Sequence, residues 1–421
     1  TTKALPKNAA MVIDEKGVWT ESACPTPGYV NDDSGYEAFL AGENAAGPVA
    51  INEVMTGNAT VLARDGVCYD WIELKNVSDG PVRLSDYRIG ESQAEPGRYP
   101  LPDVTLSAGE LIVLLCTGQQ AVTTERYHTL PLSLNAIEET LYLVDGGGAC
   151  IDALYASGLT YDGSIGRMPQ DMGIFYFASP SPGAENADGF RSVAPMPEAD
   201  TPGGVYAAGP VSVQLSGTGT VHYTLDGGMP TAADAVYDAP LTIAETTVLR
   251  AICVQPGQLA SAAFTATYII GVPHDLPVIC VTTDPAHLSG ADGILARQNR
   301  YDHDVERPAH IECFDGAAGF SLDCGIKLHG RMSRQRSRNS KLSYKVVFRG
   351  RYGTELLDYP LFENRDNTLF GSLLIRNGSD MSKSAVRDEM LSRIACRTTS
   401  ELCVMDSRFC VLYINGGYAG V

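Results

Sequence analysis

The sequence predicts a chain of several domains, in which two all-β sandwiches precede an α+β lobe. Three observations lead to this prediction. The chain of 421 residues is too long for one ordinary domain, because a domain usually has about 100–200 residues. The 43 glycines and 24 prolines favour short strands joined by turns over long helices. From Leu276 onward the hydrophobic pattern becomes a mixture of strand-like and helix-like periods.

The net charge of −19 is unevenly spread along the chain. Residues 1–270 hold 12 Lys and Arg against 32 Asp and Glu, whereas residues 271–421 hold 19 against 18. The acidic part should repel nucleic acid and anionic lipid, so we expect neither as a partner. No run approaches the roughly 20 apolar residues that span a bilayer, and the opening residues do not read as a signal peptide.

Eleven cysteines are present, and none forms a CxxC pair. This spacing argues against a zinc ribbon or a thioredoxin-like site. We expect the cysteines to be small buried apolar residues in strands, in preference to disulfides. The odd number leaves at least one free thiol.

An internal repeat marks the end of a module. Residues 19–31 and 174–186 both run from an aromatic strand end into a small-Pro-x-Pro-Gly-x-x-Asn segment, which cannot continue a sheet. The second copy closes a domain that begins near Val49. We therefore expect residues 1–46 to be the tail of a preceding module of the same kind, in a chain cut from a longer protein.

Residues 47–190 read as a β-sandwich, because short apolar or alternating runs recur between turn signals. The succession INEVM, DWIELKNVSDGPVRLSDYRI, LSAGELIVLLCTG and PSPGAEN resembles the lamin-tail domain. Modules of that family bind other molecules or act as spacers between domains, and none of their motifs implies catalysis. We therefore interpret the polar residues of the second motif, Asp70, Glu73 and Asn76, as framework, with Trp71 in or beside the core.

Residues 191–202 are predicted to be a linker, and residues 203–270 a second β-sandwich. The strand-like run that starts at Val221 enters an Asp-Gly turn, where glycine supplies the positive φ. With the runs after Tyr237, Thr247 and Ala263, this series resembles the small immunoglobulin-like domain appended to chitobiase and hexosaminidases. Asp226 is expected to be a turn residue rather than an acid catalyst.

Residues 271–421 should contain alternating strands at 277–283, 309–314, 324–330, 342–348 and 409–414. A helix is expected over about 384–397, with Ser384 as its cap and Val386, Met390 and Ile394 at four-residue spacing. Asn415-Gly-Gly should turn the last strand into a hairpin.

A basic stretch is the strongest anomaly of this region. The 25 residues from Lys327 to Arg351 hold nine basic groups and no acidic one. A loop that carries Gly, Ser and Arg between two strands is able to close over a phosphate chain, because Arg supplies forked donors and Lys a point charge. The alternatives are a solvated surface loop and a patch for an acidic polymer or nucleic acid.

The order of motifs then points to a family. They run LPVICVTTDPAHL, ERPAHIECFD, CGIKLHGRMSR, SKLSYKVVFRGRYG, LLDYPLF, LLIRNGSD, VRDEML and VLYINGGYAGV. In order and spacing, residues 274–421 resemble the N-terminal part of the CotH-type (spore-coat) atypical protein kinases. The resemblance implies a kinase-like lobe that binds ATP with Mg²⁺ or Mn²⁺ and phosphorylates Ser-rich proteins.

The resemblance also implies roles for residues. The nucleotide-side candidates are Lys327, His329, Arg334, Lys341, Lys345, Arg376 and Asn377, and the catalytic candidates are Asp380, Arg387 and Asp388. His329 is more readily a structural hydrogen-bonding residue than a general base. The family usually has two adjacent basic residues where Leu342 follows Lys341 here. Its metal-binding acids lie after the GGYAGV-like strand, so the lobe is expected to be incomplete at its C-terminus, with its metal ligands unknown.

Two functions remain open at this point. The first is a secreted or cell-surface bacterial protein with a kinase domain that transfers phosphate from ATP to protein Ser or Thr, inactive in this fragment. The second is a non-catalytic adhesion or cell-wall protein whose basic loop binds an acidic surface polymer. A hydrolase finds little support, since neither GxSxG nor HExxH occurs. The acidic run 302–306 is expected to be an exposed turn in preference to a Ca²⁺ site.

Overall fold

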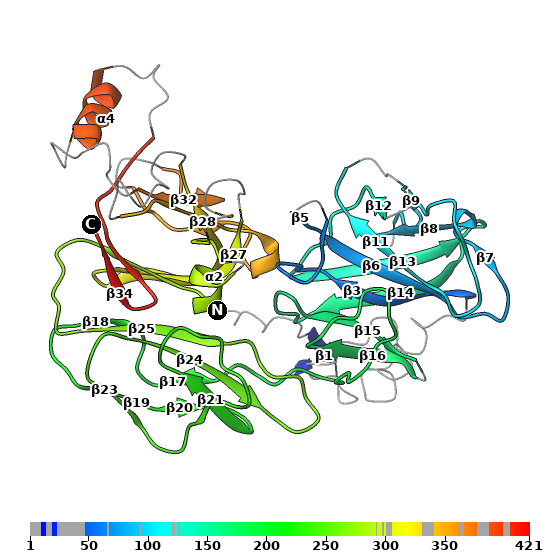
Figure 1. Cartoon of the computed structure of the whole chain (residues 1–421), viewed down its shortest axis with the longest axis horizontal. Coiled ribbons are helices and arrows are strands. Elements are labelled where there is room, and N and C mark those ends of the chain that lie inside the picture. Colours follow the sequence, from blue (N-terminus) through cyan, green and yellow to red (C-terminus); the bar gives the residue numbers. More distant parts are fainter. Residues whose placement is uncertain are drawn as a thin grey trace. The chain divides into compact units, whose positions relative to one another are not determined.

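A computed structural model shows a mostly β chain in two compact units, Thr1–Val193 and Ala194–Val421 (Figure 1). The structure describes residues 10–13, 19–22, 47–64, 67–92, 94–119, 123–124, 127–169, 171–291, 293–296, 299, 305–330, 341–362, 366–376, 387–398 and 405–421. Within these residues, no helix has both the length and the apolar character needed to cross a membrane.

The first unit is a sandwich of two sheets. The larger sheet has the order β12 (His128–Leu130), β11 (Leu111–Cys116), β6 (Asp70–Asn76), β3 (Val49–Met55), β15 (Ser164–Met168) and β16 (Asp171–Phe177). The smaller sheet has the order β14 (Cys150–Ser157), β13 (Glu138–Asp145), β8 (Tyr87–Gly90) and β9 (Tyr99–Pro100). The remaining short elements are β1 (Ala10–Ile13) with β2 (Trp19–Ser22), β4 (Ala63–Arg64) with β5 (Val67–Cys68), β7 (Val82–Arg83) with β10 (Thr105–Leu106), and the 3-10 turn η1 (Leu84–Asp86).

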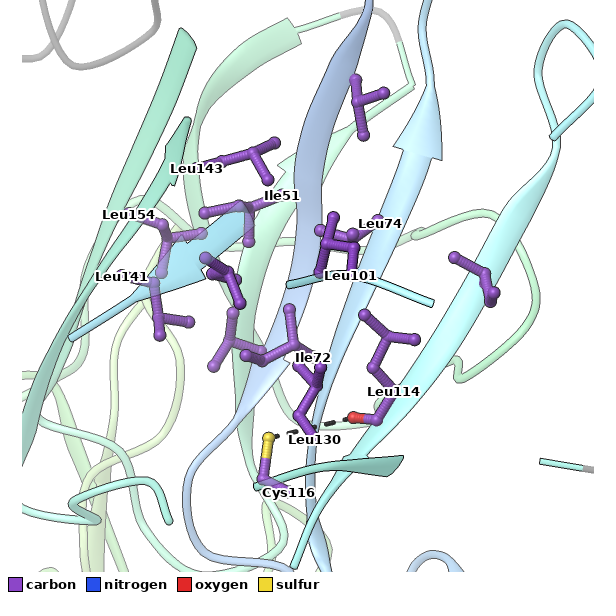
Figure 2. Close-up of a cluster of buried hydrophobic side chains, with 14 of the residues drawn as sticks. Ile51, Ile72, Leu74, Leu101, Leu114, Cys116, Leu130, Leu141, Leu143 and Leu154 are labelled. Carbon is purple, nitrogen blue, oxygen red and sulfur yellow. Dashed lines mark hydrogen bonds between the residues drawn. The ribbon is translucent and has the colours of Figure 1, made fainter. Parts of the chain in front are cut away.

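Aliphatic side chains from both sheets form the core between them. Ile72 and Leu114 of the larger sheet belong to the same buried cluster as Leu141 and Leu154 of the smaller one (Figure 2). Alternation along each strand sends every second side chain into this layer. Trp71 therefore faces the other side of its sheet, where it packs fully buried in a second cluster with Met55 and Leu115.

The second unit begins with a small β module. Its main sheet has the order β18 (Gly204–Tyr206), β25 (Phe264–Ile270), β24 (Thr247–Val254), β21 (Thr220–Thr224) and β22 (Ala235–Val236). Two strand pairs accompany this sheet, β19 (Val211–Val213) with β23 (Leu241–Ile243) and β17 (Glu198–Ala199) with β20 (Leu215–Ser216). Asp226 is the predicted turn residue, because its Oδ1 accepts a 2.9 Å hydrogen bond from Gly228 N beside Gly227 at φ +85°.

A seven-stranded sheet forms the rest of this unit. Its order is β32 (Ser372–Ile375), β29 (Tyr344–Val347), β28 (Ala318–Leu328), β27 (Arg307–Asp315), β26 (Val278–Thr282), β33 (Val411–Ile414) and β34 (Gly417–Gly420). Only β26 and β33 pair in parallel within this sheet. The other described elements are β30 (Leu357–Asp358) with β31 (Leu369–Phe370), the 3-10 turn η2 (Gly350–Tyr352), and the helices α2 (Pro285–Ser289) and α4 (Arg387–Thr398).

The predicted strands of this lobe occur where the alternation placed them, and the Asn415–Gly416 hairpin turn has positive φ at both residues. Helix α4 covers most of the expected helix, whereas its expected cap, Ser384, lies outside the described residues. Within its described residues the lobe is dominated by its sheet, and the α-helices α2 and α4 contribute only 5 and 12 residues.

Eight cysteines have side chains that the structure describes, and all eight are free thiols. Five of them are buried: Cys116, Cys253, Cys280, Cys313 and Cys324. This agrees with the expectation of small apolar strand residues. Burial raises the pKa of the Cys324 thiol well above its usual value, because the thiolate would lose its hydration.

Candidate functional site

Two buried glutamates of the first unit hold the Pro-Ser-Pro-Gly segment against the sheet. Glu53 and Glu73 are register partners on β3 and β6, and both have no exposed surface. Glu73 accepts hydrogen bonds from Asn52 Nδ2 at 2.7 Å and from the backbone N–H of Gly183. Glu53 accepts from the hydroxyl of Ser164. Glu73 is thus a framework residue, as the sequence predicted.

Burial raises the pKa of both carboxyl groups. Desolvation brings the pKa of Glu73 to about 7, and the neighbouring charge of Glu53 acts in the same direction. The pKa of Glu53 is also raised by desolvation, against the opposing effect of its bond from Ser164. Perturbed acids in a cleft often mark active sites, but these two contact the chain's own backbone and serve the fold.

An ion pair is fully buried in the same unit. Arg167 Nη2 lies 2.7 Å from Asp152 Oδ1, and their side chains are 2% and 1% exposed. Asp152 also accepts from Ile51 N at 2.7 Å, while Arg167 donates to the backbone oxygens of Ile51 and Ala153. Because every partner belongs to the sandwich, this pair joins the two sheets.

The seven-stranded sheet of the second unit has two chemically different faces. On its core face, Ile326, Leu328, Tyr344 and Val346 join a buried apolar cluster. The residues between them point to the second face, since side chains alternate along a strand. At the β26 and β33 end of the second face, Ile269 of β25 packs into a buried cluster with residues of both strands.

Lys327 and Lys345 stand directly opposite each other on the second face. They are register partners on the antiparallel strands β28 and β29, and both are half-buried. Directly opposed like charges destabilise a strand pair. His329 follows at the end of β28, where its backbone N–H donates to Ser343 O at 2.8 Å.

Lys341 lies on the other side of the sheet, at an apolar pocket. The pocket has a volume of about 340 Å³ and is lined by Lys341, Tyr344, Tyr418 and by Leu288, Leu295, Leu342, Leu412, Ile414, Gly417 and Ala419. Lys341 Nζ donates to Val421 O at 3.2 Å. Gly420 lies beside the end of the Lys341 side chain and has φ +115°, a backbone conformation that favours glycine.

The structure therefore divides the predicted nucleotide-side residues. Lys327 and Lys345 share the second face, whereas Lys341 lies with the core-face residues Leu342 and Tyr344. Arg376 is exposed just after β32. Arg334, Asn377 and Asp380 lie outside the described residues, and Arg387 and Asp388 are described only as the first backbone positions of α4.

A cluster that sequence reasoning missed occupies the second face of β27 and β28. His310 Nδ1 lies 2.8 Å from Asp323 Oδ1, and His310 Nε2 lies 2.8 Å from Ser321 Oγ. The hairpin turn between Asp315 and Ala318 fixes this pairing. Counting outward from that Asp-Gly turn would have placed residue 310 opposite residue 323.

Comparisons with known proteins agree with the two β modules. Residues 43–158 match the family model of the Lamin Tail Domain, and residues 201–265 match that of the chitobiase/beta-hexosaminidase C-terminal domain. These matches support two β-sandwich modules in the chain, each similar to one of these domains. No curated protein matches the chain.

One solved structure, titled "Biofilm associated protein - BSP domain", is 9% identical with a TM-score of 0.14. The alignment covers 77% of this chain and 66% of that chain. A likeness of this size carries no argument about fold or function.

Proposed function

We propose that the chain is part of a secreted or cell-surface bacterial protein whose last lobe binds ATP as a CotH-type atypical protein kinase does. In this protein the β modules act as spacers or attachment domains for that lobe. The observation that carries the proposal is the pocket beside Lys341. Ligand pockets are mostly apolar with a few polar groups, and about 300 Å³ is the lower end of their usual volume. The ordered motifs of residues 274–421 support the same assignment.

The pocket suits a flat apolar ring that carries an anionic chain. Tyr344 and Tyr418 offer aromatic surface, and leucines line the pocket around them. The ammonium of Lys341 at the same pocket supplies a point charge for a phosphate oxygen. In this proposal the base lies among the apolar side chains, and Lys341 contacts the phosphates.

No described residue is assigned as a ligand of the divalent metal. Among those residues, no group of three or more His, Cys, Asp or Glu side chains could hold a metal ion. Mg²⁺ or Mn²⁺ would neutralise charge on the phosphates during transfer. Within the described lobe, the roles assigned are those of Lys341 and the pocket walls: to bind and orient the nucleotide.

The two lysine sites allow a matched test. ATP binding would be measured by isothermal titration calorimetry for the wild-type chain and for Lys341→Ala and Lys345→Ala. Because a charged hydrogen bond contributes about 1.5–3 kcal/mol, Lys341→Ala should weaken binding by about 10- to 100-fold. Lys345→Ala, on the opposite face, should bind like the wild type. Nucleotide binding that is absent, or equally strong in Lys341→Ala, would refute the proposal.

A second candidate function is favoured by the opposed pair Lys327 and Lys345. A non-catalytic surface protein would use this pair to bind an acidic polymer, and counterion release would make that binding weaken with salt. Titration with polyglutamate at low and high NaCl tests this. If Lys345→Ala loses polyglutamate binding and no variant binds ATP, the adhesion function replaces the kinase function.

A further inference from the structure

The cluster on the second face has the connectivity of an activated serine. In such a site the imidazole Nε2 bonds the hydroxyl and Nδ1 bonds a carboxylate, which fixes the tautomer and stabilises the imidazolium. Here Ser321 Oγ and Asp323 Oδ1 each lie 2.8 Å from the corresponding nitrogen of His310. Both bonds are within the range for proton transfer.

A rigid hairpin holds the three side chains. Strands β27 and β28 pair over nine consecutive residue pairs, with His310 directly opposite Asp323 and Ser321 diagonal to it. Phe320 and Leu322 pack against the apolar cluster on the core face. Alternation therefore directs Ser321 and Asp323 to the second face, so the strand geometry sets their positions without a flexible loop.

The exposed fractions of the three side chains suit a largely buried general base beside a solvent-accessible nucleophile. The His310 side chain is only 11% exposed, whereas that of Asp323 is 51% exposed and Ser321 is exposed. Glu312, the next second-face residue of β27, is buried and accepts from Thr267 N at 3.2 Å. The imidazole is therefore packed in place while the hydroxyl remains accessible to a reagent.

We propose that Ser321 is a nucleophile that His310 activates and Asp323 positions, and that it takes acyl groups from small, unhindered esters. Ser321 Oγ attacks the ester carbonyl carbon, and its proton passes to His310 Nε2. The bond to the leaving alcohol breaks, and His310 returns the proton to that oxygen. Water then attacks the acyl-serine by the same proton relay, releasing the carboxylic acid and the free hydroxyl.

The first test uses a fluorophosphonate probe on the full chain. In this reaction the Ser321 Oγ–P bond forms, the P–F bond breaks, and fluoride leaves as His310 takes the proton. Intact mass and peptide mapping should show one label, on Ser321. Ser321→Ala should lose it, and Ser216→Ala, an exposed strand serine on β20, should keep it. A wild-type chain without label, or with label on another residue, overturns the proposal.

The second test separates activation from a structural role. Proton relay by a positioned side chain contributes about 10²–10⁴-fold. Asp323→Asn should therefore slow labelling and p-nitrophenyl acetate hydrolysis at least tenfold, with an unchanged far-ultraviolet circular dichroism spectrum. Asp323→Glu, which keeps a carboxylate on the second face beside His310, should recover much of the rate, whereas a loss caused only by altered packing would not be rescued in this way. A folded Asp323→Asn chain with the wild-type rate would refute the assigned roles.

Discussion

The two buried glutamates of the first unit predict that its stability falls as the pH rises from about 4.5 to about 7. An unfolded glutamate has a pKa near 4.5, whereas burial raises the pKa of Glu73 to about 7. Between these values the folded chain holds a proton that the unfolded chain has released. Stability therefore decreases with pH in this window, and it levels off on either side.

The size of the change follows from the pKa. A change of one pKa unit corresponds to about 1.4 kcal/mol, so Glu73 alone should cost about 3 kcal/mol between pH 4.5 and pH 8. Glu53 shifts in the same direction, although the two carboxyl groups titrate as a coupled pair. With a urea dependence of about 2 kcal/mol per molar, the midpoint should fall by about 1.5 M.

Tryptophan fluorescence during urea unfolding is the suitable assay, because both tryptophans, Trp19 and Trp71, belong to the first unit. Residue 73 cannot ionise in Glu73→Gln, so this variant should lose its share of about 3 kcal/mol. The pH dependence from Glu139 and Asp152, whose pKa values burial raises to about 7 and about 6, should remain. Glu95→Gln, at an exposed position, should keep the full pH dependence. If the wild-type midpoint is the same at pH 5 and pH 8, or if Glu73→Gln retains the full change, the assignment to Glu73 is wrong.

Two further substitutions test the packing of each unit. Arg167→Met leaves the Asp152 carboxylate buried without its partner, so the first unit should lose about 3–5 kcal/mol in urea unfolding, and a loss below 1 kcal/mol would contradict a buried pair. In the second unit, a Cβ at Gly203 would lie 2.8 Å from Glu312 Oε1, so Gly203→Ala should destabilise by about 1–3 kcal/mol. At Gly204 the nearest atom would be 3.6 Å away, so Gly204→Ala serves as the calorimetric control, and equal melting temperatures for the two variants would argue against this contact.

Much of the fold follows from local patterns. Alternation and turn residues located the strands of the last lobe, because both depend on neighbours only one to four positions apart. The same reasoning identified Asp226 as a turn residue and Glu73 as framework. The basic stretch was equally visible, but its central residues, 331–340, lie outside the described part of the chain.

The arrangement of the candidate sites required the tertiary structure. Composition grouped Lys341 with Lys345. In the structure Lys345 lies within β29 on the second face, whereas Lys341 precedes that strand and lines the pocket with core-face residues. The pairing of His310 with Ser321 depends on the register of a hairpin, and a shift of one residue would separate them.

By itself, the sequence determined that this protein has several modules, that its strands are short, and that its charge is divided between an acidic first part and a near-neutral last part. Only the tertiary structure showed that β26 pairs in parallel with β33. It also showed that Glu53 and Glu73, which lie on different strands, share one buried site. The physical reason is that periodicity records which face of an element is buried. It does not record which distant element packs against that face, since this depends on packing, desolvation and hydrogen bonding over the whole unit.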